Sequence, residues 1–163
     1  MPLSNSQTHP TGQANPCVLR TWAALPAAGA WDATPTVAVV QGFWWARLYF
    51  AYQRSHDTLG TLDYYYDLSP FYADAGAEDS DQAWYHGTLY AAGKMTPCQI
   101  QHSMVQQEYI SYCSTSADVE TFISPPIHLG GCIERLRVFC REGSLAVGNP
   151  GHAEVVAVFY AEG

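Results

Sequence analysis

The sequence predicts an all-β domain, a two-layer antiparallel β-sandwich of about eight strands in a jelly-roll-like arrangement. Three observations support this fold class. Short segments that alternate apolar and polar residues recur along the chain, and turn residues rich in Gly and Pro separate them at fairly regular spacing. No segment repeats apolar residues convincingly at helical intervals with capping residues at its ends; the best candidate, Pro97–Gln107, is short. At 163 residues the chain has the size of one domain and can bury a core without disulfides.

The chain begins with a polar segment that differs from the rest. Residues 1–17 are rich in Ser, Gln, Asn, Pro and Thr, a composition that predicts a flexible N-terminal arm. Residues 18–163 are predicted to form the sandwich domain. Two interpretations of the arm stay open: it is disordered, or it becomes ordered against a neighbouring subunit.

The first half of the domain contains three predicted strands. Thr36–Val40 is mostly β-branched, and Phe43–Arg54 alternates in the manner of a half-buried strand. Leu62–Leu68 alternates in the same way and is stopped by Pro70, which lacks a ladder donor. In the second of these strands, Leu48, Phe50 and Tyr52 share one face, and Arg47, Tyr49 and Gln53 share the other.

The second half contains five further predicted strands. They are Ala83–Ala91, Glu108–Ser114, Val119–Ile123, Ile133–Arg141 and Ala153–Tyr160. The last is an almost continuous apolar run, which predicts a central strand buried on both faces.

Charge is scarce in this chain. Charged residues make up 13% of the sequence, against about 25% in a typical soluble domain. The formal net charge is -8 and Lys94 is the only lysine, so binding to nucleic acid or to an anionic membrane is not expected. Interfaces favour Tyr, Trp and Arg over Lys, so the composition suggests a subunit of an assembly, including a homo-oligomer. The alternative is a large core combined with a compositional bias of the genome.

The cysteines and the N-terminus suggest a protein made in a cytoplasm. No secretion signal and no apolar run of membrane-spanning length is present. Five widely spaced cysteines do not suggest a disulfide framework, and the simplest interpretation is small buried side chains. One cross-strand disulfide, formed after release into an oxidising medium, stays an alternative.

No catalytic, cofactor or metal site is predicted, and the chain is not expected to be an enzyme. Nucleophile elbows, phosphate-binding loops and paired metal-ligand motifs are all missing from the sequence. The acidic stretch Asp74–Asp81 offers oxygen ligands for Ca²⁺ but does not match an EF-hand loop. A solvated loop is the simpler interpretation of this stretch.

Aromatic clusters give the candidate interface residues. Trp44 and Trp45 are adjacent, and Tyr65 lies between Tyr64 and Tyr66, so neighbours on a strand must point to opposite faces. If Tyr64 and Tyr66 face the core, Tyr65 faces outward, near Tyr49 if the two strands pair. Three interpretations stay open: core residues with a few exposed rings, a contact between subunits, or a platform for sugar rings.

The strand Ile133–Arg141 has the clearest polarity. Arg135, Arg137 and Arg141 lie on one face, and Leu136, Val138 and Cys140 lie on the other. In an acidic protein the arginines are most simply paired with Asp or Glu on a neighbouring strand. A contact with an acidic partner is the alternative, in which Arg135 and Arg137 join the candidate interface.

Six segments of the chain together form a recognisable pattern. They are Trp22-x-x-Leu25-Pro26-Ala27-Ala28-Gly29-Ala30-Trp31-Asp32, Arg47–Arg54, Asp63–Pro70, Ile127-x-Leu129-x-Gly131, Ile133-Glu134-Arg135-Leu136-Arg137-Val138 and Asn149-Pro150-Gly151. This pattern resembles small structural proteins of tailed bacteriophages, particularly head-decoration or auxiliary capsid proteins. The resemblance implies a β-sandwich that docks on a capsid lattice, often as a symmetric oligomer, with capsid or other virion proteins as partners and the virion as its location. The five cysteines and the high aromatic content depart from that pattern. A carbohydrate-binding β-sandwich of a phage tail or surface adhesin is the alternative function.

Overall fold

A computed structural model describes residues 14–26, 30–55, 59–70, 84–86, 109–144 and 149–161. These residues form ten strands. The strands are β1 (Cys17–Ala24), β2 (Val37–Val39), β3 (Trp45–Gln53), β4 (Thr61–Ser69), β5 (Tyr85–His86), β6 (Ile110–Cys113), β7 (Glu120–Ile123), β8 (Ile127–His128), β9 (Arg135–Glu142) and β10 (His152–Tyr160).

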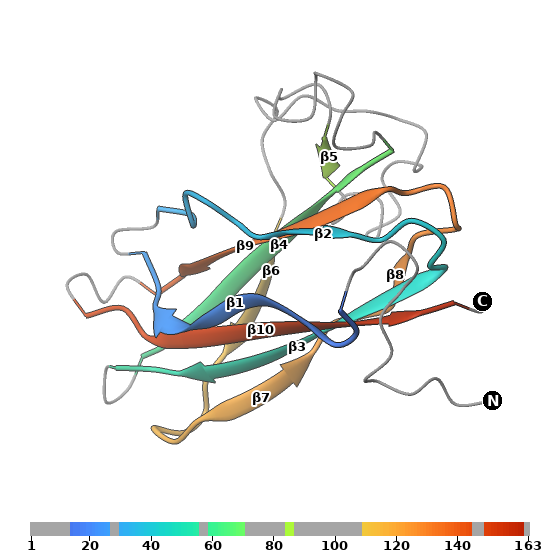
Figure 1. Cartoon of the computed structure of the whole chain (residues 1–163). Coiled ribbons are helices and arrows are strands. Elements are labelled where there is room, and N and C mark those ends of the chain that lie inside the picture. Colours follow the sequence, from blue (N-terminus) through green and yellow to red (C-terminus); the bar gives the residue numbers. More distant parts are fainter. Residues whose placement is uncertain are drawn as a thin grey trace.

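The strands form two antiparallel sheets that lie face to face (Figure 1). The first sheet has the order β1-β10-β3-β7, with β8 paired to the start of β3. The second has the order β2-β9-β4-β5, with β6 also paired to β4. The predicted all-β sandwich is therefore confirmed.

The pairing of the longer strands follows a jelly roll. When the two-residue strands β5 and β8 are set aside, the first strand pairs with the last, β1 with β10, and the second with the penultimate, β2 with β9. In the same way β3 pairs with β7, and β4 pairs with β6. Successive pairs of this long folded hairpin alternate between the two sheets, which is how a double-sheet jelly roll is built.

The core lies between the sheets and is filled by alternate residues of the long strands. The inward residues of β3 and β4 follow the predicted alternation, and Phe50 of the first sheet meets Tyr64 of the second with ring centroids 4.4 Å apart. Near one end, Tyr112 of β6 stacks on Phe122 of β7 with ring centroids 4.5 Å apart. These aromatic contacts between the sheets hold the two layers together.

The sequence did not predict β1. Its first residues alternate, with Cys17 and Leu19 buried and Val18 exposed, but its second half buries no core side chain. Its register against β10 is also irregular between Val18 and Ala23. A strand that contributes few inward residues leaves only a weak alternating pattern in the sequence.

Residues 14–17, the last residues of the predicted arm, are in contact with the last strand. Asn15 is buried, its side-chain amide donates to the carbonyl oxygen of Phe159 at 2.8 Å, and its side-chain oxygen accepts from the N–H of Phe159 at 3.0 Å. Residues 14–17 therefore belong to the sandwich, and residues 1–13 lie outside the described residues.

Two other predicted segments differ from the structure. β10 is central, as predicted, and its inward face is buried, but Val156 and Tyr160 on its outer face are only half-buried. Only residues 84–86 of the predicted strand Ala83–Ala91 are described, and β5 occupies Tyr85–His86.

The acidic stretch Asp74–Asp81 and the short helix candidate Pro97–Gln107 lie outside the described residues. No helix among the described residues is long and apolar enough to cross a membrane.

Candidate interaction surface

The outer face of the first sheet carries a row of apolar side chains that crosses four strands. Val18 of β1 is opposite Val156 of β10, Val156 is opposite Tyr49 of β3, and Tyr49 is opposite Ile123 of β7. We call these four residues the apolar row. Val18, Tyr49 and Ile123 are 49%, 36% and 53% exposed, so water reaches a face where an antiparallel sheet usually carries polar residues.

One end of the same face is aromatic. Trp45 of β3 is opposite Tyr160 of β10 on one side and His128 of β8 on the other. The rings of Trp45 and His128 are 4.8 Å apart, and Trp44, which precedes β3, lies 6.4 Å from the same histidine ring and is 45% exposed. We call Trp44, Trp45, His128 and Tyr160 the aromatic end.

The turn after β8 holds the aromatic end in place. The backbone N–H groups of Leu129 and Gly130 donate to the carbonyl oxygen of Trp44 at 2.8 and 3.1 Å. Gly130 and Gly131 have φ angles of 64° and 74°, which favour glycine. The Trp44 indole lies against Gly131, so a side chain there would meet the ring.

A shallow hollow of about 330 Å³ lies within this face, lined by Trp45, Arg47, Pro126 and Tyr160. A hydrogen bond with Tyr49, together with burial, raises the pKa of Tyr160 above its ordinary value of 10.0, whereas Arg47 lowers it. Tyr160 is therefore a neutral hydroxyl at physiological pH. The hollow combines two aromatic rings, one cation and one hydroxyl.

The outer face of the second sheet is different because the chain itself covers it. Tyr65 points outward as predicted, but it is only 4% exposed. Its ring stacks on Phe139 at 4.7 Å, and Trp31 packs edge-on against it at 4.6 Å. The strands β3 and β4 lie in different sheets, so Tyr65 is not near Tyr49. The prediction that Tyr65 belongs to an exposed surface is wrong.

Two arginines of β9, Arg137 and Arg141, pair with carboxylates of β4, as their pattern predicted. Arg137 donates to Asp67 of β4 at 2.9 and 3.1 Å, and Arg141 donates to Asp63 at 3.0 Å. The guanidinium of Arg137 also lies 4.1 Å from the ring centre of Trp84, and that of Arg141 lies 4.2 Å from the ring centre of Trp31. These contacts combine ion pairs with cation–π stacking.

Arg135 and Arg137 consequently do not belong with the exposed aromatics. Arg135 is 4% exposed, with Trp84 stacked on its guanidinium at 4.6 Å, and Arg137 is half-buried. Of the six predicted interface residues, the structure brings Trp44, Trp45 and Tyr49 together on the first sheet. It places Tyr65, Arg135 and Arg137 in the covered layer on the opposite side of the molecule.

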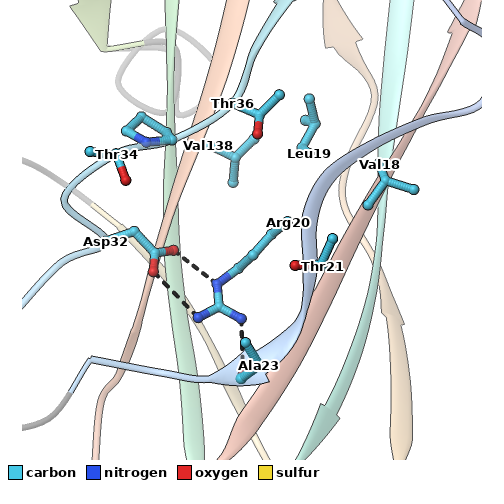
Figure 2. Close-up of a pocket in the computed structure, with 10 residues that line it drawn as sticks. Val18, Leu19, Arg20, Thr21, Ala23, Asp32, Thr34, Thr36 and Val138 are labelled. Atoms are coloured by element: carbon cyan, nitrogen blue, oxygen red, sulfur yellow. Dashed lines mark hydrogen bonds and ion pairs between the residues drawn. The ribbon is translucent and has the colours of Figure 1, made fainter.

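A second pocket, of about 240 Å³, lies beside β1 and the segment leading to β2 (Figure 2). Arg20 points at Asp32 there, and its guanidinium also donates to the carbonyl oxygens of Ala23, Ala24 and Ala153. These five contacts match the five N–H groups of the guanidinium, so no donor is left for a ligand. Asp32 in turn accepts from the N–H of Cys140, so the pair joins the first sheet to the second and is structural.

Other chemical groups in the described part of the chain do not converge on a site. No group of three or more His, Cys, Asp or Glu residues there is arranged to hold a metal ion. Cys17 and Cys140 are buried as predicted, whereas Cys113 and Cys132 are exposed, and none of these four cysteines forms a disulfide. Burial raises the pKa of the Cys140 thiol far above its ordinary value, so this thiol is not a nucleophile.

Sequence reasoning missed several residues of this surface. The sequence predicts no strand that includes Val18, and it predicts that Val156 and Tyr160 belong to a strand buried on both faces. His128 carried no signal, since an isolated histidine is usually solvated. The sequence feature that could have identified Val156 and Tyr160 is the continuous apolar run of β10. Such a run shows that the outer face of the strand is apolar, but it does not show whether another part of the protein covers that face.

Comparison of the chain with protein-family models, with curated proteins and with solved structures finds no match.

Proposed function

We propose that this chain is a structural protein of a virus particle, an auxiliary capsid subunit that docks through the outer face of its first sheet. The observation that carries the proposal is the exposed apolar row beside the aromatic end. Proteins that function as monomers in water rarely expose such a face, and large exposed apolar patches mark interaction sites. Tyr and Trp are also the residues that interfaces favour.

Two further features support a virion subunit. Double-sheet jelly rolls are common in viral capsid domains, although the same fold serves other functions. Asn15 is bonded to Phe159, the neighbour of Tyr160, so Asn15 lies close to the aromatic end. We propose that residues 1–13, whose composition predicts an arm, bind the same neighbour as the aromatic end.

The proposal is tested on purified particles of the virus whose genome encodes the chain. Mass spectrometry should find the chain in the particles at a fixed copy number. Particles lacking it should bind the purified protein, and a Trp44→Ala, Trp45→Ala double variant should reduce occupancy at least about tenfold if these rings are interface anchors.

Trp22→Ala is the matched control. Trp22 is an exposed tryptophan on β1, stacked on His152 at the other end of β10, away from the aromatic end. Its removal should leave occupancy unchanged. Absence of the chain from purified particles would refute the proposal.

Carbohydrate binding is a second candidate, favoured by the hollow between Trp45 and Tyr160. Aromatic rings can stack on the apolar face of a sugar, while Arg47 and the neutral Tyr160 hydroxyl offer hydrogen bonds. A glycan array tests it: a hit that is lost in Trp45→Ala but kept in Trp22→Ala would support sugar binding, and an array without hits would count against it. Tyr65→Ala is unsuitable here because Tyr65 is buried.

A further inference from the structure

We propose that two copies of this chain pair through the outer faces of their first sheets, around a two-fold axis that runs along the apolar row. The proposal assigns the apolar row to a second copy of the chain and leaves the aromatic end for the capsid contact, and it holds whether or not the chain belongs to a virus particle. It rests on the register of the strands and on two charges beside the row.

The register places the charges symmetrically about the row. On β3, Arg47 lies two residues to one side of Tyr49, and on β10, Glu154 lies two residues to the other side of Val156. All four side chains point outward, because they alternate with buried neighbours along both strands. The row thus has a cation on one side and an anion on the other.

Neither charge has an ion pair with another described residue of its own chain. The arginines Arg20, Arg137 and Arg141 each contact a carboxylate, but Arg47 does not. Arg47 is opposite Val158, whereas Glu154 is opposite Ala51, four residues further along β3. Four residues of extended chain span about 13 Å, and no ion pair joins these two side chains within the described part of the chain.

A two-fold axis along the row brings these charges together between copies. The rotation reverses the strand direction, so each β3 faces β3 of the other copy and Arg47 lies over the partner's Ala51. The neighbour of Ala51 on the adjacent strand is Glu154, about one strand spacing (4.8 Å) away, within reach of an arginine side chain. Symmetry generates the same contact twice, as an isologous interface requires.

The other in-plane axis does not give this complementarity. A two-fold axis parallel to the strands leaves the position of every residue along the strand direction unchanged. Arg47 then lies at the same height as Arg47 of the other copy, and Glu154 lies at the same height as Glu154 of the other copy. Since like charges at one level oppose association, the charges select the axis along the row.

The second sheet offers no comparable surface. Trp31, Tyr109 and Trp84 lie over its outer face and stack on its arginines, so its aromatic residues are used within the chain. Two sheets that pack face to face with nearly aligned strands lie about 10 Å apart and bury the side chains between them. In such a dimer Trp44, which precedes β3, stays at the rim and available to a third partner.

Sedimentation equilibrium of the purified chain tests the proposal. The wild type should form a discrete dimer. Arg47→Glu and Glu154→Arg should each weaken the dimer at least about tenfold, and the double variant Arg47→Glu, Glu154→Arg should recover most of the loss because the pair is re-formed with exchanged signs. Val156→Asp, at the centre of the row, should abolish the dimer.

Gln41→Glu is the matched control, since it adds negative charge in an exposed turn between β2 and β3, outside the apolar row. It should not change the dissociation constant, and circular dichroism should show that every variant is folded. A wild type that stays monomeric at all concentrations would overturn the proposal. It would also be overturned if the single charge changes left the dissociation constant of the dimer unchanged, or if the double variant did not restore it. None of these outcomes depends on whether the chain is present in virus particles, which is measured separately.

Discussion

Glu142 is a buried carboxylate whose partners come from both sheets. The Tyr52 hydroxyl donates to it at 2.8 Å, the N–H of Gly151 at 2.9 Å, and the N–H of Thr61 at 3.0 Å. Burial and the bond to Glu142 raise the pKa of Tyr52 well above 10.0, so its hydroxyl remains a donor. Gly151 packs directly on the Tyr52 ring, where a Cβ would be 2.6 Å from it. Glu142 therefore joins β3, β4 and the start of β10 at one end of the sandwich.

We expect Glu142→Gln to lower the free energy of unfolding by about 2 kcal/mol, since an amide replaces a charged acceptor of several hydrogen bonds. Tyr52→Phe should cost about 1 kcal/mol because it removes one of them. Urea unfolding measures both, with Asp118→Asn in an exposed turn as the control. Equal stability of Glu142→Gln and the wild type would show that Glu142 does not join the sheets.

Glu120 contributes to the free energy of unfolding, and the size of its contribution depends on pH. Its carboxylate accepts from the N–H groups of Ser116 and Thr115, both at 2.7 Å, and these bonds lower its pKa below the ordinary value of 4.5. A carboxyl group with a lowered folded-state pKa stabilises the fold above its unfolded pKa. That stabilisation is lost as the pH falls through the folded-state pKa.

The melting temperature of Glu120→Gln should therefore be below that of the wild type at neutral pH, and the difference should shrink as the pH falls below 4.5. Thermal unfolding at a series of pH values measures it. A difference that does not change with pH would mean that the carboxylate charge contributes nothing to this turn.

At the scale of elements, the pairing of β4 with β9 explains why the second sheet tolerates charge in its outer layer. Asp67 is directly opposite Arg137, and Asp63 is directly opposite Arg141. The side chains of Asp67 and Asp63 are almost fully buried, under the aromatic rings that stack on the arginines. Removing one partner leaves a charge that water cannot easily reach.

Asp67→Ala should lower the free energy of unfolding by about 3 kcal/mol, because it leaves Arg137 unpaired in this layer. The double variant Asp67→Leu, Arg137→Leu should be less destabilised than the single variant, since both charges are gone. Chemical denaturation of the two variants provides the comparison. A loss below about 1 kcal/mol for the single variant would instead indicate a pair that behaves as if exposed.

At the scale of the whole molecule, the N-terminal segment is joined to the last strand. Asn15 uses both atoms of its side-chain amide to bond the backbone of Phe159, and Cys17 begins β1 beside β10. Asn15 therefore belongs to the sandwich, since its side-chain bonds fix the chain where it enters β1.

A chain that lacks residues 1–16 should unfold at a lower temperature than a chain that lacks residues 1–13, because only the first loses the Asn15 bonds. Asn15→Ala in the full chain should reproduce the difference, at about 1–3 kcal/mol for two lost hydrogen bonds. Differential scanning calorimetry of the three proteins measures it. Identical melting temperatures of the two truncated chains would show that residues 14–16 do not stabilise the sandwich.

Much of the fold follows from the sequence alone because side chains on a strand alternate with a period of two. That period correctly assigned Leu48, Phe50 and Tyr52 to the core and the arginines of β9 to the outer layer. The eight predicted strands included seven of the eight that make up the jelly roll. The missing one, β1, buries too few side chains to show the pattern.

What covers each outer face was decided only by the tertiary structure. Alternation shows which side of a strand a residue occupies, but contacts between distant residues determine what lies above it. Tyr65 and Tyr49 both point outward, yet Trp31 buries the first while the second remains exposed in the apolar row. The sequence therefore determined the two layers and their alternation, and the packing of residues far apart in the chain decided which of the two outer faces stays open to a partner.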